Sequence, residues 1–186
     1  VTTLHVIEIP PSLPLDTFFP EKLAVADYAM EQLQAIGREY EVPIDAQVKQ
    51  GEWIRGMLTQ LCGKTLGVIG TGVIGLRMAQ LAKGIGMQVI AWTFHPSSER
   101  AAQLGIQYVE LDELLRTADV VSLHVKLTDD SRRFIGKREL GLMKRGSLLI
   151  NGARGGMVDT PALIEALNSG HLGGAAIDVY DQEPLP

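Results

Sequence analysis

Apolar residues recur along this chain at two different spacings, which predict strands and helices in alternation. Short apolar runs bounded by turn residues indicate buried strands, and apolar residues repeated every three or four positions indicate amphipathic helices. The run Lys64–Ile69 ends at Gly70, and a helical pattern follows it up to Gly86. We predict strands at Lys64–Ile69, Gln88–Thr93, Gln107–Val109, Asp119–Val125, Ser147–Asn151 and Gly174–Val179, with later helices at Ser97–Leu104, Leu111–Arg116, Lys137–Met143 and Pro161–Ser169.

The repeated order of strand and helix predicts the α/β class, with a Rossmann-type doubly wound parallel sheet. Parallel strands need a long crossover connection, and each predicted helix supplies one. In the last helix, Thr160 is the expected N-cap and Pro161 the first helical residue, a position that proline favours.

The N-terminal part of the chain does not fit this alternation. Residues 1–20 contain four prolines, which exclude a helix there, so we expect a connector between domains. Lys22–Gly37 predicts an amphipathic helix outside the sheet, with an apolar face formed by Leu23, Ala26, Met30, Leu33 and Ile36. We interpret it as a helical arm that packs against a partner subunit or a neighbouring domain, and residues 21–186 as one nucleotide-binding domain.

Composition narrows the class of protein. Of the 186 residues, 46% are hydrophobic and only 21% are charged, too apolar a mixture for disorder. The net charge of −5 argues against a nucleic-acid surface, and no run is long enough for a membrane span. The first residues lack the basic pattern of a secretory signal, and the single cysteine, Cys62, fits a reducing cytoplasm and is expected to be buried.

A glycine-rich turn, GTGVIG at Gly70–Gly75, stands between the first predicted strand and its helix. In such a turn Gly70 permits a tight bend, Gly72 lets the backbone approach a pyrophosphate, and Gly75 lets the helix pack closely. The amides of Val73 and Ile74 would bind the phosphates. The alternative is a tight strand-to-helix turn without a ligand, because glycine-rich turns are common.

A second motif, NGARGG at Asn151–Gly156, supplies an arginine after another predicted strand. Together with the segments SLHVKLTDDSRRFI and DVYDQEPLP, these motifs resemble the nucleotide-binding domain of the D-isomer-specific 2-hydroxyacid dehydrogenases, from about Leu23 to the last residue. A planar guanidinium can grip a carboxylate with two hydrogen bonds and polarise a ketone beside it. Without the resemblance, Arg154 would be read as a surface arginine.

The resemblance implies a role for several residues. Arg154 and Glu183 match the family's catalytic arginine and glutamate. Asp178 matches an aspartate that accepts a hydrogen bond from the nicotinamide carboxamide. Smaller cofactor contacts are implied for Val125, Ser131, Ala153 and the backbone of Arg154. His124 matches a wall of the cofactor cleft rather than an acid or base, and no metal site is expected.

The sequence departs from the family pattern in three places. Thr93 replaces the usual aspartate that binds the ribose hydroxyls, so NADP is compatible with the site, although NAD remains the first expectation. Lys126 stands where the family commonly has proline. The family's catalytic histidine follows the Glu183–Pro184 dipeptide, whereas all four histidines of this chain precede it.

Two hypotheses follow. The first is the cofactor-binding domain of an NAD(P)-dependent oxidoreductase that interconverts 2-oxo acids and D-2-hydroxy acids, with a cytoplasmic location, a homodimer and a substrate-binding domain outside these residues. The second is a nucleotide-sensing module of the same fold that controls protein assembly. Arg154, Asp178 and Glu183 together favour the enzyme.

Overall fold

The computed structural model describes residues 5–6, 49–51 and 60–183. Contacts along the chain divide it into one unit of residues 1–9 and 60–186 and a second of residues 10–59. The predicted helical arm, Lys22–Gly37, and the predicted boundary at residue 20 lie outside the described residues, so both stay predictions.

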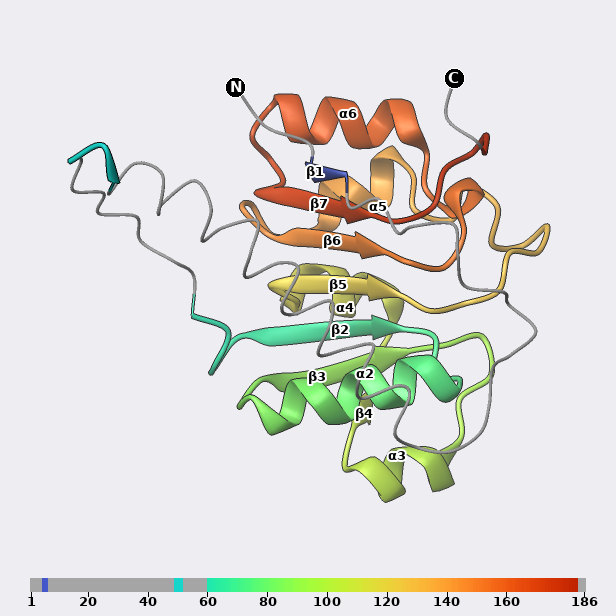
Figure 1. The fold of residues 1–186 in the computed structure, drawn as a ribbon. Helices are drawn as coiled ribbons and strands as arrows, with labels where there is room; N and C mark the ends of the chain where they lie inside the picture. Colours follow the sequence, from blue (N-terminus) through green and yellow to red (C-terminus); the bar gives the residue numbers. More distant parts are fainter. Residues whose placement is uncertain (1–4, 7–48, 52–59, 184–186) are drawn as a thin grey trace. The chain divides into compact units, whose positions relative to one another are not determined.

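One parallel sheet carries the fold (Figure 1). Its strand order is β1-β7-β6-β5-β2-β3-β4, and every neighbouring pair is parallel. This confirms the predicted doubly wound sheet, since the chain builds outward from β2 first in one direction and then in the other. The strands are β1 (His5–Val6), β2 (Thr65–Ile69), β3 (Gln88–Trp92), β4 (Gln107–Tyr108), β5 (Val120–Leu123), β6 (Leu148–Asn151) and β7 (Gly174–Ile177).

The edge strand β1 was not predicted. It consists of two residues inside the expected connector, and they pair with Ala176 and Ile177 of β7. Two residues are too few to produce an alternating pattern, so only the pairing identifies this strand.

The helices predicted from the glycine turn onward are confirmed, with bounds that differ from prediction by at most two residues. Ala79 and Ala82 of α2 belong to one buried cluster, and Leu114, Leu140 and Leu163 from α4, α5 and α6 belong to another. Helices therefore cover both faces of the sheet (Figure 1). The helices are α2 (Val73–Gly84), α3 (Ser98–Leu104), α4 (Leu111–Thr117), α5 (Lys137–Leu142), the short 3-10 helix η2 (Gly155–Met157) and α6 (Thr160–Asn168).

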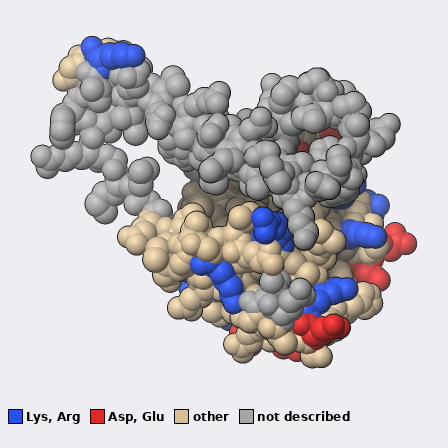
Figure 2. Space-filling model, turned by 60° about the horizontal axis from the view of Figure 1, so that its bottom comes forward, with Lys and Arg blue, Asp and Glu red and all other residues tan. Residues whose placement is uncertain are grey.

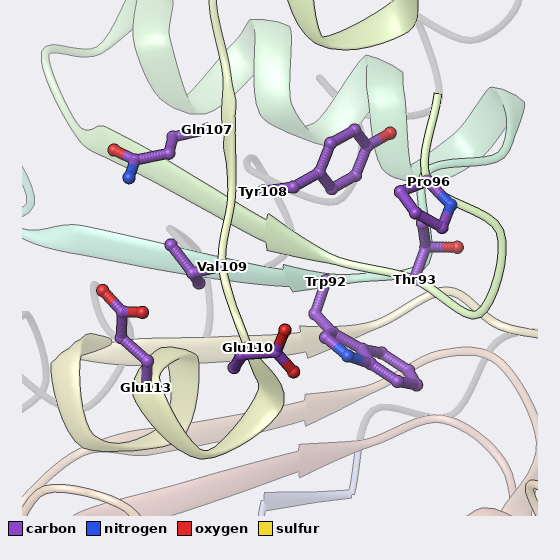
Figure 3. Close-up of a pocket in the computed structure, with 8 residues that line it drawn as sticks. All are labelled: Trp92, Thr93, Pro96, Gln107, Tyr108, Val109, Glu110 and Glu113. Atoms are coloured by element: carbon purple, nitrogen blue, oxygen red, sulfur yellow. The ribbon is translucent and has the colours of Figure 1, made fainter. Parts of the chain in front are cut away.

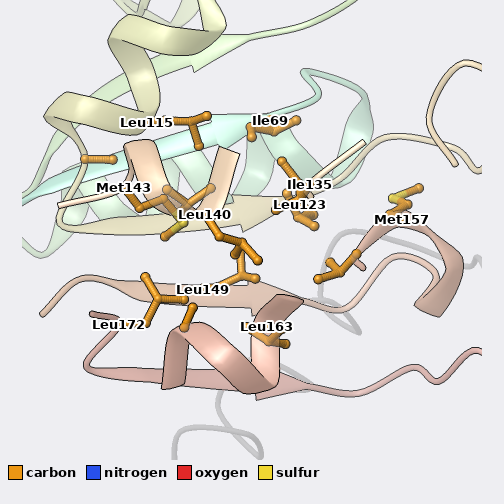
Figure 4. Close-up of a cluster of buried hydrophobic side chains, with 14 of the residues drawn as sticks. Ile69, Leu115, Leu123, Ile135, Leu140, Met143, Leu149, Met157, Leu163 and Leu172 are labelled. Atoms are coloured by element: carbon orange, nitrogen blue, oxygen red, sulfur yellow. The ribbon is translucent and has the colours of Figure 1, made fainter. Parts of the chain in front are cut away.

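The central strand β2 is buried on both faces, as its almost continuous apolar run requires. Leu66 and Val68 pack in the cluster with α2, and Ile69 packs in the opposite cluster shown in Figure 4. A Cβ on Gly67 would lie only 2.5 Å from Cδ2 of Leu114. Glycine at this position therefore lets α4 pack directly on the strand.

Two local predictions were wrong. The N-cap of α6 is Asp159, whose Oδ1 accepts the Ala162 N–H at 3.1 Å, and Thr160 is the first helical residue. Both residue types are good caps, and the helix starts one residue earlier than Pro161 suggested. Cys62 is exposed rather than buried, because it lies in the turn before β2 and not in a core element.

Candidate functional site

The glycine loop between β2 and α2 owes its form to two glycines that admit no side chain. Gly70 has a φ of +101°, and a Cβ there would lie 2.7 Å from the carbonyl of His124. A Cβ on Gly75 would collide with the carbonyl oxygen of Gly70. The start of α2 is therefore packed against β2 and the end of β5, at the point where the strand order reverses.

Gly72 has different surroundings. A Cβ on this residue would meet no atom within 4 Å, and its φ of −74° is open to any residue. The first helical hydrogen bond runs from Leu76 N–H to the Gly72 carbonyl at 2.9 Å, so the amides of Val73 and Ile74 precede the helical ladder. Their side chains are 83% and 72% exposed. This open helix start, with no acidic residue in its first turn, suits an anion such as a pyrophosphate.

His124 forms the floor of this loop. Its Cβ lies 3.3 Å from where a Gly75 Cβ would stand, and its Nε2 is 2.9 Å from the buried hydroxyl of Ser122. Burial lowers the pKa of His124 to about 4, so the ring is neutral near pH 7. The position of His124 against the glycine loop agrees with the cleft wall that the family resemblance implies.

The end of β3 lies beside the glycine loop. Tyr108 OH and Thr71 Oγ1 are 2.8 Å apart, which joins β4 to the loop. Nη1 of Arg100, in α3, reaches the Thr71 carbonyl at 3.4 Å. The half-buried Thr93 follows β3 directly, so an uncharged hydroxyl and a guanidinium flank this end of the loop.

A cavity of about 380 Å³ opens next to Thr93 (Figure 3). Two of its carboxylates, Glu110 and Glu113, come from the start of α4. Thr93 is the only predicted site residue in its lining, so the cavity does not coincide with Arg154 or Glu183. The lining residues are Trp92, Thr93, Pro96, Gln107, Tyr108, Val109, Glu110 and Glu113.

The loop after β6 presents Arg154 on the surface. Asn151 accepts the Ala153 N–H through Oδ1 at 3.1 Å and donates from Nδ2 to the Arg154 carbonyl at 3.0 Å. The Arg154 side chain is exposed, and its Nη1 donates to the Ala153 carbonyl at 2.6 Å. Asn151 was not predicted as a site residue, although its place three residues before the arginine is a usable signal.

The segment after β7 lies against this loop. A Cβ on Gly155 would overlap the carbonyl of Tyr180, and Thr160 Oγ1 donates to Asp181 Oδ2 at 2.9 Å. The exposed Glu183 turns back and accepts the Tyr180 N–H at 2.9 Å. Segments that are distant in the sequence and carry Arg154 and Glu183 are thus neighbours in the fold.

Asp178 begins that segment at the end of β7. Its N–H donates to the Asn151 carbonyl at 3.1 Å. Partial desolvation, followed by the nearby charge of Glu183, raises the pKa of the Asp178 carboxyl. The negative charge of Glu183 therefore acts on the Asp178 carboxyl.

Val125 and Ser131 lie on the loop after β5. Val125 Cγ1 would be 2.8 Å from a Gly70 Cβ, which puts Val125 against the glycine loop. Ser131 is 0% exposed, and its hydroxyl is 2.7 Å from both the Lys126 carbonyl and the Thr128 amide. That hydroxyl shapes the loop, and the cofactor contact of Ser131 stays a prediction.

Among the described residues, charged and metal-binding side chains form no further candidate site. Basic and acidic side chains are interspersed on the face of the described residues that Figure 2 displays. Within residues 5–6, 49–51 and 60–183, no group of three or more His, Cys, Asp or Glu side chains could hold a metal. Across the same ranges, none of the helices has the length and apolar character to cross a membrane.

Known proteins share both the sequence and the fold. Glyoxylate reductase of Thermococcus litoralis is 42% identical over 170 residues, which are 87% of this chain and 51% of that protein. D-3-phosphoglycerate dehydrogenase of Archaeoglobus fulgidus is 41% identical over 165 residues, 87% of this chain and 31% of that protein. The apo-structure of D-lactate dehydrogenase from Escherichia coli superposes with a TM-score of 0.73 at 35% identity, covering 86% of this chain and 51% of that one.

The chain thus spans about half the length of the glyoxylate reductase and about a third of the phosphoglycerate dehydrogenase. A family model described as D-isomer specific 2-hydroxyacid dehydrogenase, NAD binding domain, matches residues 34–186, which include the glycine loop and the Arg154 loop. The chain therefore belongs to the D-isomer specific 2-hydroxyacid dehydrogenases, and residues 34–186 are an NAD-binding domain of that family.

Proposed function

We propose that this chain is the cofactor-binding part of an oxidoreductase that transfers a hydride between NAD(P)H and a 2-oxo acid, with a D-2-hydroxy acid as the reduced partner. The observation that carries the proposal is the placement of two loops. Gly70–Gly75 follows β2 and Asn151–Gly156 follows β6, and both strands are parallel, so the two loops lie at the same edge of the sheet on either side of β5. Crevices at the carboxyl edge, near the strand reversal, are where open α/β sheets bind ligands.

The proposed cofactor contacts follow the described surroundings. The open side of Gly72 and the amides of Val73 and Ile74 would hold the pyrophosphate. Thr93 would face the adenosine ribose. The backbone at Val125 and Ala153, with Asp178, would hold the nicotinamide half. When bound, the cofactor supplies or accepts the hydride, and the chain's own residues bind the cofactor and orient it.

Arg154 is proposed to hold the carboxylate of the 2-oxo acid and polarise its ketone. Its exposure at the rim leaves the guanidinium available for two parallel hydrogen bonds. Glu183 is proposed to raise the proton affinity of the histidine that the family carries after this glutamate, so that the histidine can protonate the developing alkoxide. Relatives named glyoxylate reductase and D-lactate dehydrogenase support a small 2-oxo acid as substrate.

We further propose that the site accepts NADP as well as NAD. Thr93 carries no charge that would repel a 2′-phosphate, and the Arg100 guanidinium stands over the Thr71 carbonyl on the same side. Thr93→Asp should shift the ratio of the two affinities toward NAD, because a carboxylate accepts hydrogen bonds from both ribose hydroxyls and repels the phosphate. Equal ratios in variant and parent by calorimetry would show that the ribose is read elsewhere, at Ser97 or Arg100, and a parent chain that binds no NADP would contradict the proposal.

The first test is binding. The 186-residue chain should bind NADH in calorimetry, and a lack of binding to either dinucleotide would overturn the proposed function. The second test joins this chain to the substrate-binding part of the Thermococcus litoralis glyoxylate reductase and measures glyoxylate reduction. Arg154→Lys should lower kcat/KM by at least about a hundredfold, roughly 2.7 kcal/mol. Arg145→Lys, at an exposed position away from the loop, is the matched control.

A homodimer is proposed through the arm Lys22–Gly37, whose apolar face needs cover. Charging Met30 and Leu33 together should give a monomer in sedimentation, and a parent chain that is already monomeric would contradict the dimer. The second candidate function, nucleotide-controlled assembly, is favoured only by the family fold. NADH binding that changes the state of association, with no reduction by the joined protein, would support it over the enzyme.

A further inference from the structure

Asn151 ends β6 and is only 1% exposed, so its side-chain amide needs partners inside the protein. Both ends of the amide find them on the same short loop. The oxygen accepts the Ala153 N–H at 3.1 Å, and the nitrogen donates to the Arg154 carbonyl at 3.0 Å. These two hydrogen bonds of the Asn151 side chain therefore fix the backbone at Ala153 and Arg154.

The backbone of Asn151 is used as well. Its carbonyl accepts the Asp178 N–H at 3.1 Å, which continues the pairing of β6 with the chain one residue beyond the end of β7. One residue is thus bonded to the loop that carries Arg154 and to the segment that leads to Glu183. Gly155 strengthens the same junction, since its missing side chain leaves room for Tyr180.

Few residue types could make these bonds. Serine is too short to span both partners, and glutamine is one methylene longer. Aspartate has the right shape, but when ionised it only accepts hydrogen bonds, and one oxygen would face the Arg154 carbonyl. A buried carboxyl has a raised pKa, and once protonated it regains one donor.

We propose that Asn151 is the positioning residue for Arg154, with its side-chain amide fixing the loop that aims the guanidinium and its carbonyl fixing the neighbouring Asp178 segment. That the loop directs Arg154 at a substrate rests on the proposed function. The hydrogen bonds of Asn151 themselves can be tested in the unliganded chain. The Met157 amide reports on the loop, because it donates to the Arg154 carbonyl at 3.3 Å.

The experiment compares Asn151→Asp, Asn151→Ser and the exposed control Asn168→Asp in the 186-residue chain. Hydrogen exchange by NMR gives protection factors for the Met157 and Asp178 amides at pH 8 and pH 5.5. Calorimetry with NAD⁺ at the same two pH values gives the dissociation constants. Asn151→Ser introduces no charge and covers the case in which the aspartate variant fails to fold.

At pH 8 we expect Asn151→Asp to lower Met157 protection at least tenfold and to weaken NAD⁺ binding several-fold. Both effects should recover at pH 5.5, where the aspartate can donate again. Asn151→Ser should show both losses at both pH values, and Asn168→Asp should show neither loss at either pH. The Asp178 amide should stay protected in all variants, because its bond is to the Asn151 backbone carbonyl.

Variants at Asn151 that match Asn168→Asp in Met157 protection would overturn the inference. So would losses in Asn151→Asp that do not depend on pH. A parent chain that binds no NAD⁺ would instead refute the proposed function, and the exchange data would still decide the role of Asn151.

Discussion

The two loops at the carboxyl edge of the sheet are built by opposite means. The loop Gly70–Gly75 depends on atoms that are missing, since Gly70 and Gly75 leave no room for a side chain against His124 and against each other. The loop Asn151–Gly156 depends on polar groups that are present, since the Asn151 amide bonds to both Ala153 and Arg154. In the proposed function the first loop would offer backbone amides to the cofactor, whereas the second would offer a charged side chain to the substrate.

This difference predicts different responses to substitution. A loop held by close backbone packing loses its fold when any Cβ is added at the contact, and polar changes elsewhere matter little to it. A loop held by hydrogen bonds keeps its packing when a donor is removed, but its backbone and side chains are no longer held in one orientation, because the buried partner is left unsatisfied. Each loop contains a tightly packed glycine and one with more room, Gly75 and Gly72 in the first loop and Gly155 and Gly156 in the second. The roomier glycine is the control for the packed one.

The largest expected effect comes from the glycine loop. Gly75→Ala should destabilise the chain by more than about 3 kcal/mol in urea unfolding, because its Cβ meets the Gly70 carbonyl oxygen. Gly72→Val adds more atoms but points them into open space, so it should cost no more than about 1 kcal/mol of stability. It should nevertheless weaken NADH binding at least tenfold, about 1.4 kcal/mol. Similar unfolding free energies for the two variants would contradict the contrast.

A second pair sharpens the comparison within the Arg154 loop. Gly155→Ala should cost about 2–3 kcal/mol in thermal or urea unfolding, because its Cβ overlaps the Tyr180 carbonyl. Gly156→Ala places its Cβ 3.4 Å from Leu127 Cδ2 and should cost less than about 1 kcal/mol. If both variants unfold like the parent, the segment after β7 does not press on this loop.

His124 predicts how the glycine loop responds to pH. Its folded-state pKa of about 4 lies below the ordinary value of 6.5, so the unfolded chain takes up the proton first as the pH falls. This residue should therefore remove about 2 kcal/mol of stability between pH 8 and pH 5. His124→Gln should flatten that part of the curve of unfolding free energy against pH. An unchanged slope relative to the parent would show that other groups dominate it.

The smallest expected effect concerns the carboxylates after β7. Glu183→Gln removes a negative charge that raises the pKa of Asp178, so the Asp178 pKa should move down in an NMR titration of its carboxyl carbon. Glu165→Gln, on the exposed face of α6, is a control that should leave it unchanged. The stability change should be under about 0.5 kcal/mol, since both groups are exposed. An Asp178 titration that does not move would mean that desolvation alone raises its pKa.

Much of this fold could be predicted from the sequence because its signals are local. The apolar run before Gly70 identifies β2, and the helical spacing after it identifies α2. Each of these signals depends only on residues that are close together in the chain. The turn that joins them was predictable for the same reason. Arg154 and Glu183 were predicted as site residues through the resemblance of their motifs to the family, and the family match over residues 34–186 agrees with that resemblance, while their roles stay predictions.

The structure supplied what pattern analysis leaves open. The contact of Gly70 and Gly75 with His124 joins residues about fifty positions apart, and the overlap avoided at Gly155 involves Tyr180. No local spacing encodes such neighbours. The burial of single side chains also became clear only in the structure. The buried Ser131 hydroxyl is hydrogen-bonded within its own loop, and Cys62 is exposed.

By itself, then, the sequence determined the order of strands and helices, the position of the glycine turn and the residue types available at the sheet edge. Only the tertiary structure decided which of those residues meet, because pairing β5, β2, β6 and β7 in parallel brings distant loops to one edge. The physical reason is that hydrophobic periodicity and turn chemistry act within a few residues. Close approach, desolvation and shared hydrogen bonds depend on neighbours that only the folded sheet provides.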